Sequence, residues 1–248
     1  MITSFRIVIF SIMAPTSSTE EIKVLVTGFG PFRDVTTNPS WEIARNLPTE
    51  LTSPNGTPIK LIVSGPIPVV YHKVFAQSPE LIEKHNPHLV VHIGLDAGID
   101  YIAVEQSALK EGYHEIPDYD RKVFTRSDNK TAFAKHPSSL KSSLDLESAV
   151  SACQSACASV TIPVKDADNA NGKQAKRRLE VKLSDDVGTY LCGFIYYCSM
   201  LEMQKRKEKR DVVFVHVPPL ESEAEISAGA QIVRELIGAL VDTSVTKA

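Results

Sequence analysis

The chain has 248 residues, a formal net charge of −3 and 43% hydrophobic residues. This length and composition supply a large apolar core and exclude a disordered, collagenous or coiled-coil protein. Because 27 Lys and Arg nearly balance 30 Asp and Glu, the chain lacks the strong positive field that attracts nucleic acids or anionic membranes. We therefore expect no nucleic-acid partner and no membrane partner.

The cysteine content indicates a reducing environment. Four cysteines in 248 residues, without paired C-x-x-C motifs, are typical of an intracellular protein rather than a disulfide scaffold. We therefore expect a cytoplasmic location. Cys153 and Cys157 are neighbours on one face of a predicted helix, but without a histidine or further cysteine pair nearby they do not indicate a metal site.

The N-terminal segment is distinct from the rest of the chain. Residues 2–13 are apolar with a single charge, at Arg6, and are well short of the roughly 20 residues that a membrane-spanning helix needs. A signal peptide cleaved near Ala14 and an extension ahead of the folded domain are both open explanations. We favour an extension over residues 1–21, because the regular pattern begins at Ile22.

From Ile22 onward, β-branched runs alternate with amphipathic stretches, which is the pattern of βα units. We predict strands at 22–29, 58–63, 89–93, 101–107, 181–184 and 211–217, and helices after Asn38 and at 69–85, 140–160, 188–203 and 221–241. No repeat or flexible linker divides the chain. The sequence therefore predicts one three-layer α/β/α sandwich with a mostly parallel central sheet over residues 22–242, followed by a tail at 243–248.

Two polar segments lie outside this alternation. Residues 165–180 lack both the helix and the strand period, and we predict an inserted surface loop. The basic cluster at 205–210 lies at the expected end of a helix. Its positive charges complement the helix dipole there, which we prefer to a nucleic-acid patch.

Cys192 is the candidate nucleophile. It lies at the start of a predicted helix, after the Gly188-Thr189 turn, where free backbone N–H groups and the helix dipole favour a thiolate. Cys198 lies in the middle of the same helix and is expected to be a small buried hydrophobic residue.

A thiol nucleophile needs a general base, and the base needs an orienting group. His216 ends the last predicted strand, at the sheet edge where the Cys192 helix begins. His92 lies inside a buried strand and is better explained as a hydrogen-bonded core residue. Glu105 closes an apolar run, where a carboxylate is costly unless it is paired. Together, Glu105, Cys192 and His216 indicate a cysteine hydrolase.

The turn after the first strand places two aromatic rings at a strand end. Gly28-Phe29-Gly30-Pro31-Phe32 lacks the third glycine of a dinucleotide motif and the GK[ST] of a phosphate loop. Ligands of open α/β sheets bind at the carboxyl ends of strands. On the residues alone, core packing explains both rings more simply, and a slot for a small ring is the alternative.

Four blocks of sequence occur in a fixed order: VLVTGFGPFRDVTTNPSWEIARNL at 24–47, residues 94–118, DVGTYLCGFIYY around Cys192 and VFVHVPPL around His216. In this order, they resemble four segments of pyroglutamyl peptidase I, also called pyrrolidone-carboxylate peptidase. The first two are its first strand with the NPSW helix and its glycine loop with the glutamate strand. The last two are its AGT-x-x-CN segment and its F-[IV]-H-[VI]-P segment. This family comprises cysteine peptidases that remove an N-terminal pyroglutamate. Four ordered blocks are more specific than any single motif.

The resemblance implies an α/β/α sandwich and a catalytic triad of Glu105, Cys192 and His216. In this triad, His216 would take the thiol proton and Glu105 would hold the imidazole in the productive tautomer. The thiolate of Cys192 would attack the pyroglutamyl carbonyl, and backbone N–H groups nearby would stabilise the oxyanion.

The resemblance also implies the substrate pocket. Phe29 and Phe32 would sandwich the lactam ring, and Ile116, Tyr190 and Leu191 would complete the pocket. The implied partners are peptides with an N-terminal pyroglutamate, and no metal or organic cofactor is implied. One chain does not define the oligomeric state.

The chain departs from the family pattern at several positions. Its glycine loop is Gly94-Leu95-Asp96-Ala97-Gly98, where the family usually has G-Q-A-G-G. Gln106 and Glu115 stand where arginines are usual, and Gly193 stands in place of an asparagine. These differences affect substrate affinity and the pocket more than the class of reaction.

The sequence therefore predicts a cytoplasmic cysteine omega-peptidase that removes N-terminal pyroglutamate. Two alternatives stay open. The departures from the family pattern motivate a non-catalytic homologue that binds a pyroglutamyl-like ligand. The aromatic slot motivates a hydrolase of another small lactam or amide.

Overall fold

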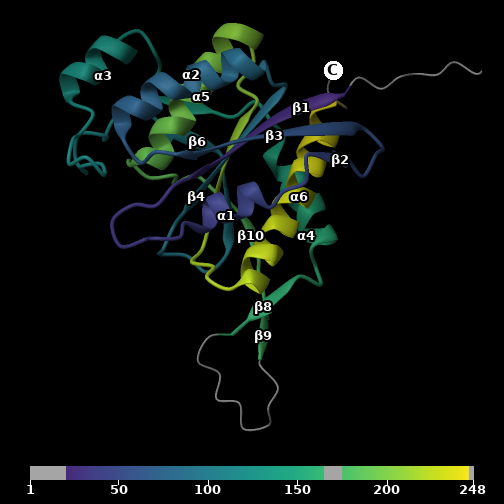
Figure 1. Ribbon diagram of the computed structural model, residues 1–248. Coiled ribbons are helices and arrows are strands. Elements are labelled where there is room, and N and C mark those ends of the chain that lie inside the picture. The colour runs from purple at the N-terminus through teal and green to yellow at the C-terminus, as the bar shows by residue number, and fades with distance from the viewer. Residues whose placement is uncertain (1–20, 165–174, 246–248) are drawn as a thin grey trace, which may run out of the picture.

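The computed structural model describes residues 21–164 and 175–245, which form three layers around a central sheet (Figure 1). The sheet has seven strands in the order β10-β5-β11-β4-β1-β3-β2. Their bounds are Ile22–Phe29 (β1), Glu50–Thr52 (β2), Pro58–Ile67 (β3), Leu89–Leu95 (β4), Ile102–Glu105 (β5), Val181–Ser184 (β10) and Val212–Val217 (β11). The prediction of an α/β/α sandwich with a mostly parallel sheet is confirmed.

Four neighbouring strands run in one direction, and the strands toward the two edges of the sheet run in the opposite direction. β11, β4, β1 and β3 are parallel to one another, so their carboxyl ends meet at one edge of the sheet. β5 pairs antiparallel with β11, β10 is parallel to β5, and β2 pairs antiparallel with β3. The glutamate at the end of β5 therefore lies beside the middle of β11.

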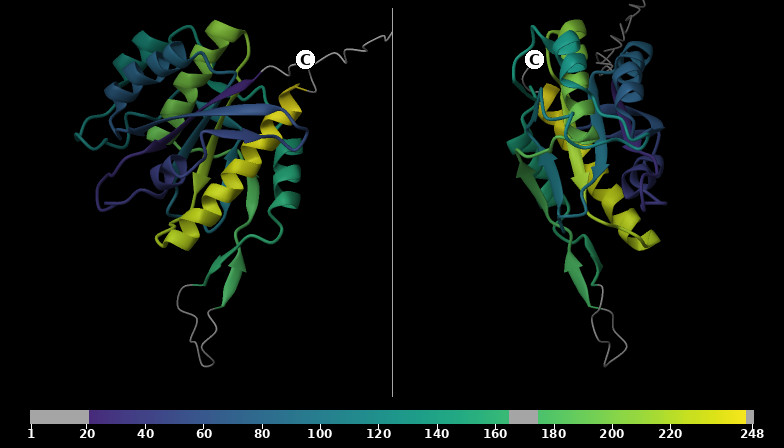
Figure 2. Two further views of the ribbon diagram at one scale, coloured as in Figure 1. Left: turned by 45° about the vertical axis from the view of Figure 1, so that its right-hand side comes forward. Right: turned by 90° about the vertical axis from the view of Figure 1, so that its left-hand side faces the viewer.

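Helices cover both faces of the sheet, as the edge-on view of Figure 2 shows. One face carries α1 (Pro39–Arg45), α4 (Leu146–Ala156) and α6 (Glu223–Val245), whose apolar side chains form one buried cluster with the sheet. The other face carries α2 (Tyr71–His85) and α5 (Leu191–Lys207), with the short α3 (Arg126–Phe133) beside them. β11 is buried along its whole length and β4 up to its last residue, because helices exclude water from both faces.

Two small antiparallel pairs lie outside the main sheet. β6 (Ser107–Leu109) pairs with β7 (Ser139–Lys141), and β8 (Thr161–Pro163) pairs with β9 (Lys176–Arg178). The β8–β9 pair projects from the body of the molecule in both views of Figure 2.

Several predicted elements differ from the observed ones. The strand predicted at 101–107 is divided between β5 and β6, and the helix predicted at 140–160 is shortened to α4 because β7 precedes it. β2 and α3 were not predicted.

In the inserted segment, residues 165–174 lie outside the described residues, whereas part of 175–180 is strand β9 rather than loop. α6 continues to Val245, so the predicted boundary at 242 is too early. Residues 1–20 of the predicted extension lie outside the described residues.

None of the helices in the described part of the chain combines the length and apolar character that crossing a membrane requires.

A buried network joins the start of α1 to the turn after β1. The side chain of Asn38 accepts the backbone N–H of Ser40 at 3.1 Å and donates to the carbonyl oxygen of Gly30 at 3.0 Å. The hydroxyl of Ser40 accepts the backbone N–H of Phe29 at 3.0 Å. A side chain at Gly28 would lie only 2.4 Å from the carbonyl oxygen of Ser40. This close approach fixes the turn that carries the two phenylalanines.

We predict that Asn38→Ala lowers the free energy of unfolding by about 2 kcal/mol, because the helix loses its N-cap and buried groups lose their partners. Urea denaturation followed by circular dichroism measures the change. Asn55→Ala, in an exposed turn, is the control and should shift the value by less than about 0.5 kcal/mol. Equal effects of the two substitutions would contradict the structural role of the network.

Candidate active site

Glu105 and His216 form a buried pair between β5 and β11. His216 Nδ1 donates to Glu105 Oε1 at 2.8 Å, and the two residues are 5% and 1% exposed. The antiparallel register places Glu105 directly opposite Phe214, two residues before His216. Opposite and diagonal residues of an antiparallel pair share one face of the sheet. The carboxylate therefore reaches the imidazole diagonally across the two strands, from the face that α5 covers.

Cys192 is the second residue of α5 and contacts the same imidazole. Its thiol interacts with His216 and raises the pKa of the imidazole. Because Nδ1 is paired with Glu105, Nε2 is the nitrogen left for this interaction. Tyr190, the N-cap residue, makes no side-chain capping bond in the described structure. The first N–H groups of a helix have no intrahelical acceptor. Free amide donors therefore surround the partly exposed thiol, as the sequence indicated.

Two glycines let the backbone approach this site closely. A side chain at Gly94 would lie 2.5 Å from the ring of Phe214 and 3.0 Å from Cys192 Sγ. A side chain at Gly193 would lie 2.2 Å from the carbonyl oxygen of Gly188. This tight turn therefore has room only for glycine at position 193, where the family pattern has asparagine.

The charges around His216 favour its protonated form. Burial alone lowers the pKa of His216, but the Cys192 thiolate and then the Glu105 carboxylate raise it by more, and the resulting pKa is about 10. Opposite charges at short range stabilise each other strongly when water is excluded. The site therefore favours the imidazolium form of His216. The second carboxylate oxygen of Glu105 has no hydrogen-bond partner among the described residues.

The predicted pocket residues surround the start of α5. Phe29, Phe32, Tyr190 and Leu191 belong to, or pack against, the apolar cluster that Cys192 also contacts. Phe29 and Leu191 are buried, whereas Phe32 and Tyr190 are half-buried. All four residues therefore belong to the apolar layer on the α2/α5 side of the sheet.

Ile116, the remaining predicted pocket residue, lies on the loop that covers this side. It is 38% exposed, and its carbonyl oxygen accepts the hydroxyl of Tyr71 at 3.2 Å. The hydroxyl of Tyr190 donates to the carbonyl oxygen of the next residue, Pro117, at 3.3 Å. The loop is therefore anchored to the start of α2 and to the N-cap of α5.

Sequence reasoning missed two residues that hold this loop. Tyr71 is fully buried at the start of α2, and its ring packs edge-on against Tyr190 with centroids 6.0 Å apart. Burial raises the pKa of Tyr71, so it stays a neutral donor. Asp118 is also buried and accepts the backbone N–H groups of Tyr71 at 3.0 Å and Lys122 at 2.9 Å. The Ile-Pro-Asp turn was visible in the sequence, but nothing there linked Asp118 to Tyr71.

The other candidate groups behave as core residues. Both ring nitrogens of His92 are hydrogen-bonded at 2.7 Å, one to Thr27 and one to Ser199. Burial lowers the pKa of His92 to about 3, so it stays neutral. Cys198 is buried, and burial raises the pKa of its thiol. The described residues hold no group of three or more His, Cys, Asp or Glu arranged to bind a metal ion.

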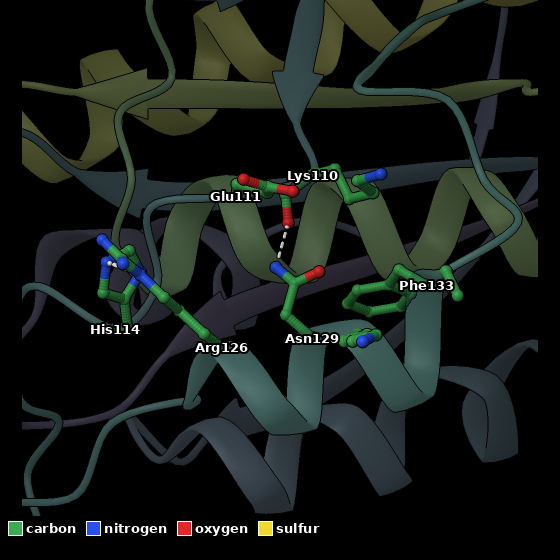
Figure 3. Close-up of a pocket in the computed structure, with 8 residues that line it drawn as sticks. Lys110, Glu111, His114, Arg126, Asn129 and Phe133 are labelled. Carbon is green, nitrogen blue, oxygen red and sulfur yellow. Dashed lines mark hydrogen bonds between the residues drawn. The ribbon is translucent and has the colours of Figure 1, made fainter.

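A separate hollow of about 380 Å³ lies between α3 and the loop that follows β6 (Figure 3). Its polar side chains pair with local groups: Arg126 Nε donates to His114 Nε2 at 3.0 Å, and Asn129 Nδ2 donates to the carbonyl oxygen of Lys110 at 2.7 Å. None of the three predicted catalytic residues lines it. The candidate active site is therefore the cysteine at the start of α5, not this hollow.

The chain is similar to known pyroglutamyl peptidases over most of its length. A sequence model described as pyroglutamyl peptidase matches residues 22–138. Human pyroglutamyl-peptidase 1 is 31% identical over 219 residues, which cover 88% of this chain and 90% of the human protein. The pyrrolidone-carboxylate peptidase of Thermosipho melanesiensis is 29% identical over 203 residues, which cover 79% of this chain and 83% of that protein.

Solved structures share the fold. The pyroglutamyl peptidase I of Bacillus amyloliquefaciens matches with a TM-score of 0.66 at 21% identity, over 91% of this chain and 96% of that one. The pyrrolidone carboxyl peptidase of Thermococcus litoralis matches with a TM-score of 0.66 at 19% identity, over 92% and 96%. The chain is a cysteine-type peptidase with an α/β fold. It belongs to the pyroglutamyl peptidase family.

We predict that His216 keeps its proton until the pH approaches 10. A pKa raised on folding stabilises the protein below the unfolded pKa of about 6.5, and this stability is lost as the pH rises through the folded pKa. NMR titration of ring-labelled histidine measures the pKa. Cys192→Ala and Glu105→Gln should each lower it, because each removes a negative partner.

Cys198→Ala is the matched control, since it removes a buried thiol six residues along the same helix and should leave the titration of His216 unchanged. A His216 pKa near 6.5 in the unaltered protein would show that the three groups do not interact as described.

Proposed function

We propose that the protein hydrolyses the amide bond after an N-terminal pyroglutamate, with Cys192 as nucleophile, His216 as general acid and base, and Glu105 as the orienting residue. The observation that carries the proposal is the continuous contact from Glu105 through His216 to Cys192 at the start of α5. Relatives named pyroglutamyl-peptidase support the identity of the substrate.

The reaction follows from the position of each group. His216 takes the proton of Cys192 before attack, because the imidazolium and thiolate stabilise each other in the buried site. The thiolate then adds to the pyroglutamyl carbonyl carbon. Free N–H groups in the first turn of α5 stabilise the oxygen that becomes negative. His216 Nε2 returns its proton to the leaving amine, and the carbonyl remains attached to sulfur as a thioester.

The second half of the reaction uses the same groups, with His216 now accepting a proton instead of donating one. Water takes the place of the departed amine, and neutral His216 accepts its proton as the oxygen attacks the thioester. The thiolate of Cys192 leaves and free pyroglutamate is released. Throughout both steps, Glu105 holds Nδ1–H, so that Nε2 always faces the reacting atoms.

The aromatic residues at the sheet edge supply the pocket for the lactam ring. We infer that Phe29 and Phe32 hold its faces, with Tyr190, Leu191 and Ile116 around it. A small neutral ring gains by leaving water for such a surface, and a free N-terminal ammonium would lose its hydration there. The pocket therefore favours a cyclised N-terminus over an unmodified glutamine or glutamate.

We also propose a cytoplasmic location and a single catalytic domain that begins at Ile22. All four cysteines lie among the described residues and are free, as expected of a protein in a reducing compartment. A reducing compartment would also keep the Cys192 thiol in its reactive form.

We predict that the protein releases the fluorophore from a pyroglutamyl arylamide under reducing conditions. Cys192→Ala should abolish turnover, and Glu105→Gln should lower kcat by roughly 10²- to 10⁴-fold, because the imidazole loses its orienting charge. Cys198→Ala should keep most of the activity.

Undiminished turnover by Cys192→Ala would contradict the proposed nucleophile. Absence of turnover together with measurable binding of pyroglutamate would indicate a non-catalytic homologue. Faster cleavage of another aminoacyl arylamide would indicate a different lactam or amide substrate.

We predict that Phe32→Ala raises KM for the pyroglutamyl arylamide by about tenfold, because one face of the ring loses a contact worth about 1.4 kcal/mol. Phe75→Ala is the matched control, since Phe75 is also partly exposed but lies on α2 outside the proposed pocket. Equal KM values for Phe32→Ala and the unaltered protein would remove Phe32 from the pocket.

A further inference from the structure

A second cavity, of about 480 Å³, opens at the edge of the sheet where the parallel strands end. Three segments line it: residues 34–37 after β1, Leu95 at the end of β4 with Ala97 beyond it, and residues 219–221 after β11. The first of these is the purple loop that projects between β1 and α1 in Figure 1. β1 has β3 on one side and β4 on the other. The order in which strands are added to the sheet therefore changes direction at β1. Open α/β sheets bind ligands in the crevice at such a reversal.

The cavity is continuous with the catalytic residues along two strands. Leu95 directly follows Gly94, the residue whose backbone lies against Cys192 Sγ. Gly94 is paired with His216 in the parallel register of β4 and β11. Consecutive Cα atoms are about 3.8 Å apart. The cavity lining therefore begins one residue beyond Gly94, the glycine that lies beside Cys192.

The cavity and the lactam pocket lie on opposite sides of this edge. Phe29, Phe32 and Tyr190 belong to the apolar layer of α2 and α5. The cavity instead includes Leu220, which belongs to the layer of α1, α4 and α6, and Pro39, the first residue of α1. The acyl group and the leaving amine lie on opposite sides of a scissile carbonyl carbon. With the lactam ring on the α5 side, the leaving peptide extends toward the cavity.

The lining of the cavity has a definite chemistry. Its walls are largely apolar, from Val35, Leu95, Ala97 and Leu220, and its charged members are the carboxylates of Asp34 and Glu221. Among the described residues that line it, none is Lys, Arg or His. An apolar wall with the Asp34 carboxylate at its rim matches a side chain that has an aliphatic stem and a positive end.

We propose that this cavity binds the leaving part of the substrate and selects pyroglutamyl peptides with Lys or Arg at the first or second residue after the pyroglutamate. The proposal rests on the proposed function, because it assigns the other half of the same substrate. The basis is the position of the cavity beside Gly94, opposite the lactam pocket, and its negative rim.

Competition between peptides tests the proposal. Pyroglutamyl-Lys-Ala amide and pyroglutamyl-Ala-Lys amide are compared with their Glu counterparts, with a pyroglutamyl arylamide as the reference for basal activity. At low salt, kcat/KM should be about fivefold higher for Lys than for Glu at one or both positions, as expected for partly exposed charge pairs. The preference should decline toward unity at high salt, where exposed charges are screened.

Charge reversal at the rim sharpens the test. Asp34→Lys should abolish or invert the preference for Lys, and Asp34→Asn should weaken it, each measured as the ratio of kcat/KM for the Lys and Glu peptides. Glu50→Lys makes the same change of charge at an exposed position on β2, at the far edge of the sheet, and should leave the preference unchanged.

The possible failures are distinct. Cleavage of the arylamide with equal rates for Lys and Glu peptides would overturn the cavity assignment and leave the proposed function intact. A Lys preference that Asp34→Lys does not reduce would also overturn it. Absence of arylamide cleavage would overturn the proposed function, and the subsite assignment with it.

Discussion

The site depends on one buried hydrogen bond, from His216 Nδ1 to Glu105 Oε1 at 2.8 Å. Burial of a carboxylate costs several kcal/mol unless a positive partner and hydrogen bonds compensate for it. Here the partner is an imidazole whose other nitrogen faces a thiol. Cys192 and, less strongly, Glu105 raise the pKa of His216 to about 10, so the buried carboxylate has a protonated partner. The same bond fixes the ring orientation, so stability and chemistry depend on a single contact.

The reversed direction of β5 makes this contact possible. A parallel β5 would place its carboxyl end beside the end of β11, and Glu105 would lie at the exposed rim. The antiparallel register instead places Glu105 opposite Phe214, inside the sheet and diagonal to His216. Phe214 packs against the His216 ring with centroids 4.8 Å apart and also limits the residue at Gly94 to glycine. Burial of the acid, orientation of the base and access to the sulfur follow from this one arrangement.

Parts of this arrangement were predictable from the sequence because they have local causes. The apolar runs of β1, β4 and β11 predicted buried parallel strands, and the turn before Cys192 predicted a helix start with free N–H groups. Glu105 was identifiable because it ends an apolar run, where an unpaired charge is unfavourable. The capping residues Thr125 and Asp128 are the only local signal for α3, because this eight-residue helix buries a single side chain.

Other features depend on contacts between distant segments, which no local pattern encodes. The antiparallel pairing of β5 with β11 brings Glu105 to His216, which is 111 positions later in the sequence. The bond between Asp118 and the backbone of Tyr71 crosses 47 positions. The reason for glycine at position 193 became visible only when the carbonyl oxygen of Gly188 was placed against it. Tertiary packing decides such features, and they include the loop that carries Ile116 and Asp118.

The central claim is that Cys192 carries the acyl group during turnover. The most direct measurement is rapid acid quenching during hydrolysis of a pyroglutamyl arylamide, followed by mass spectrometry of the peptides. The account predicts a pyroglutamyl thioester on the peptide that contains Cys192, and no adduct in Cys192→Ala. Hydrolysis that continues in Cys192→Ala, or an adduct on Cys153, Cys157 or Cys198 in place of Cys192, would contradict it.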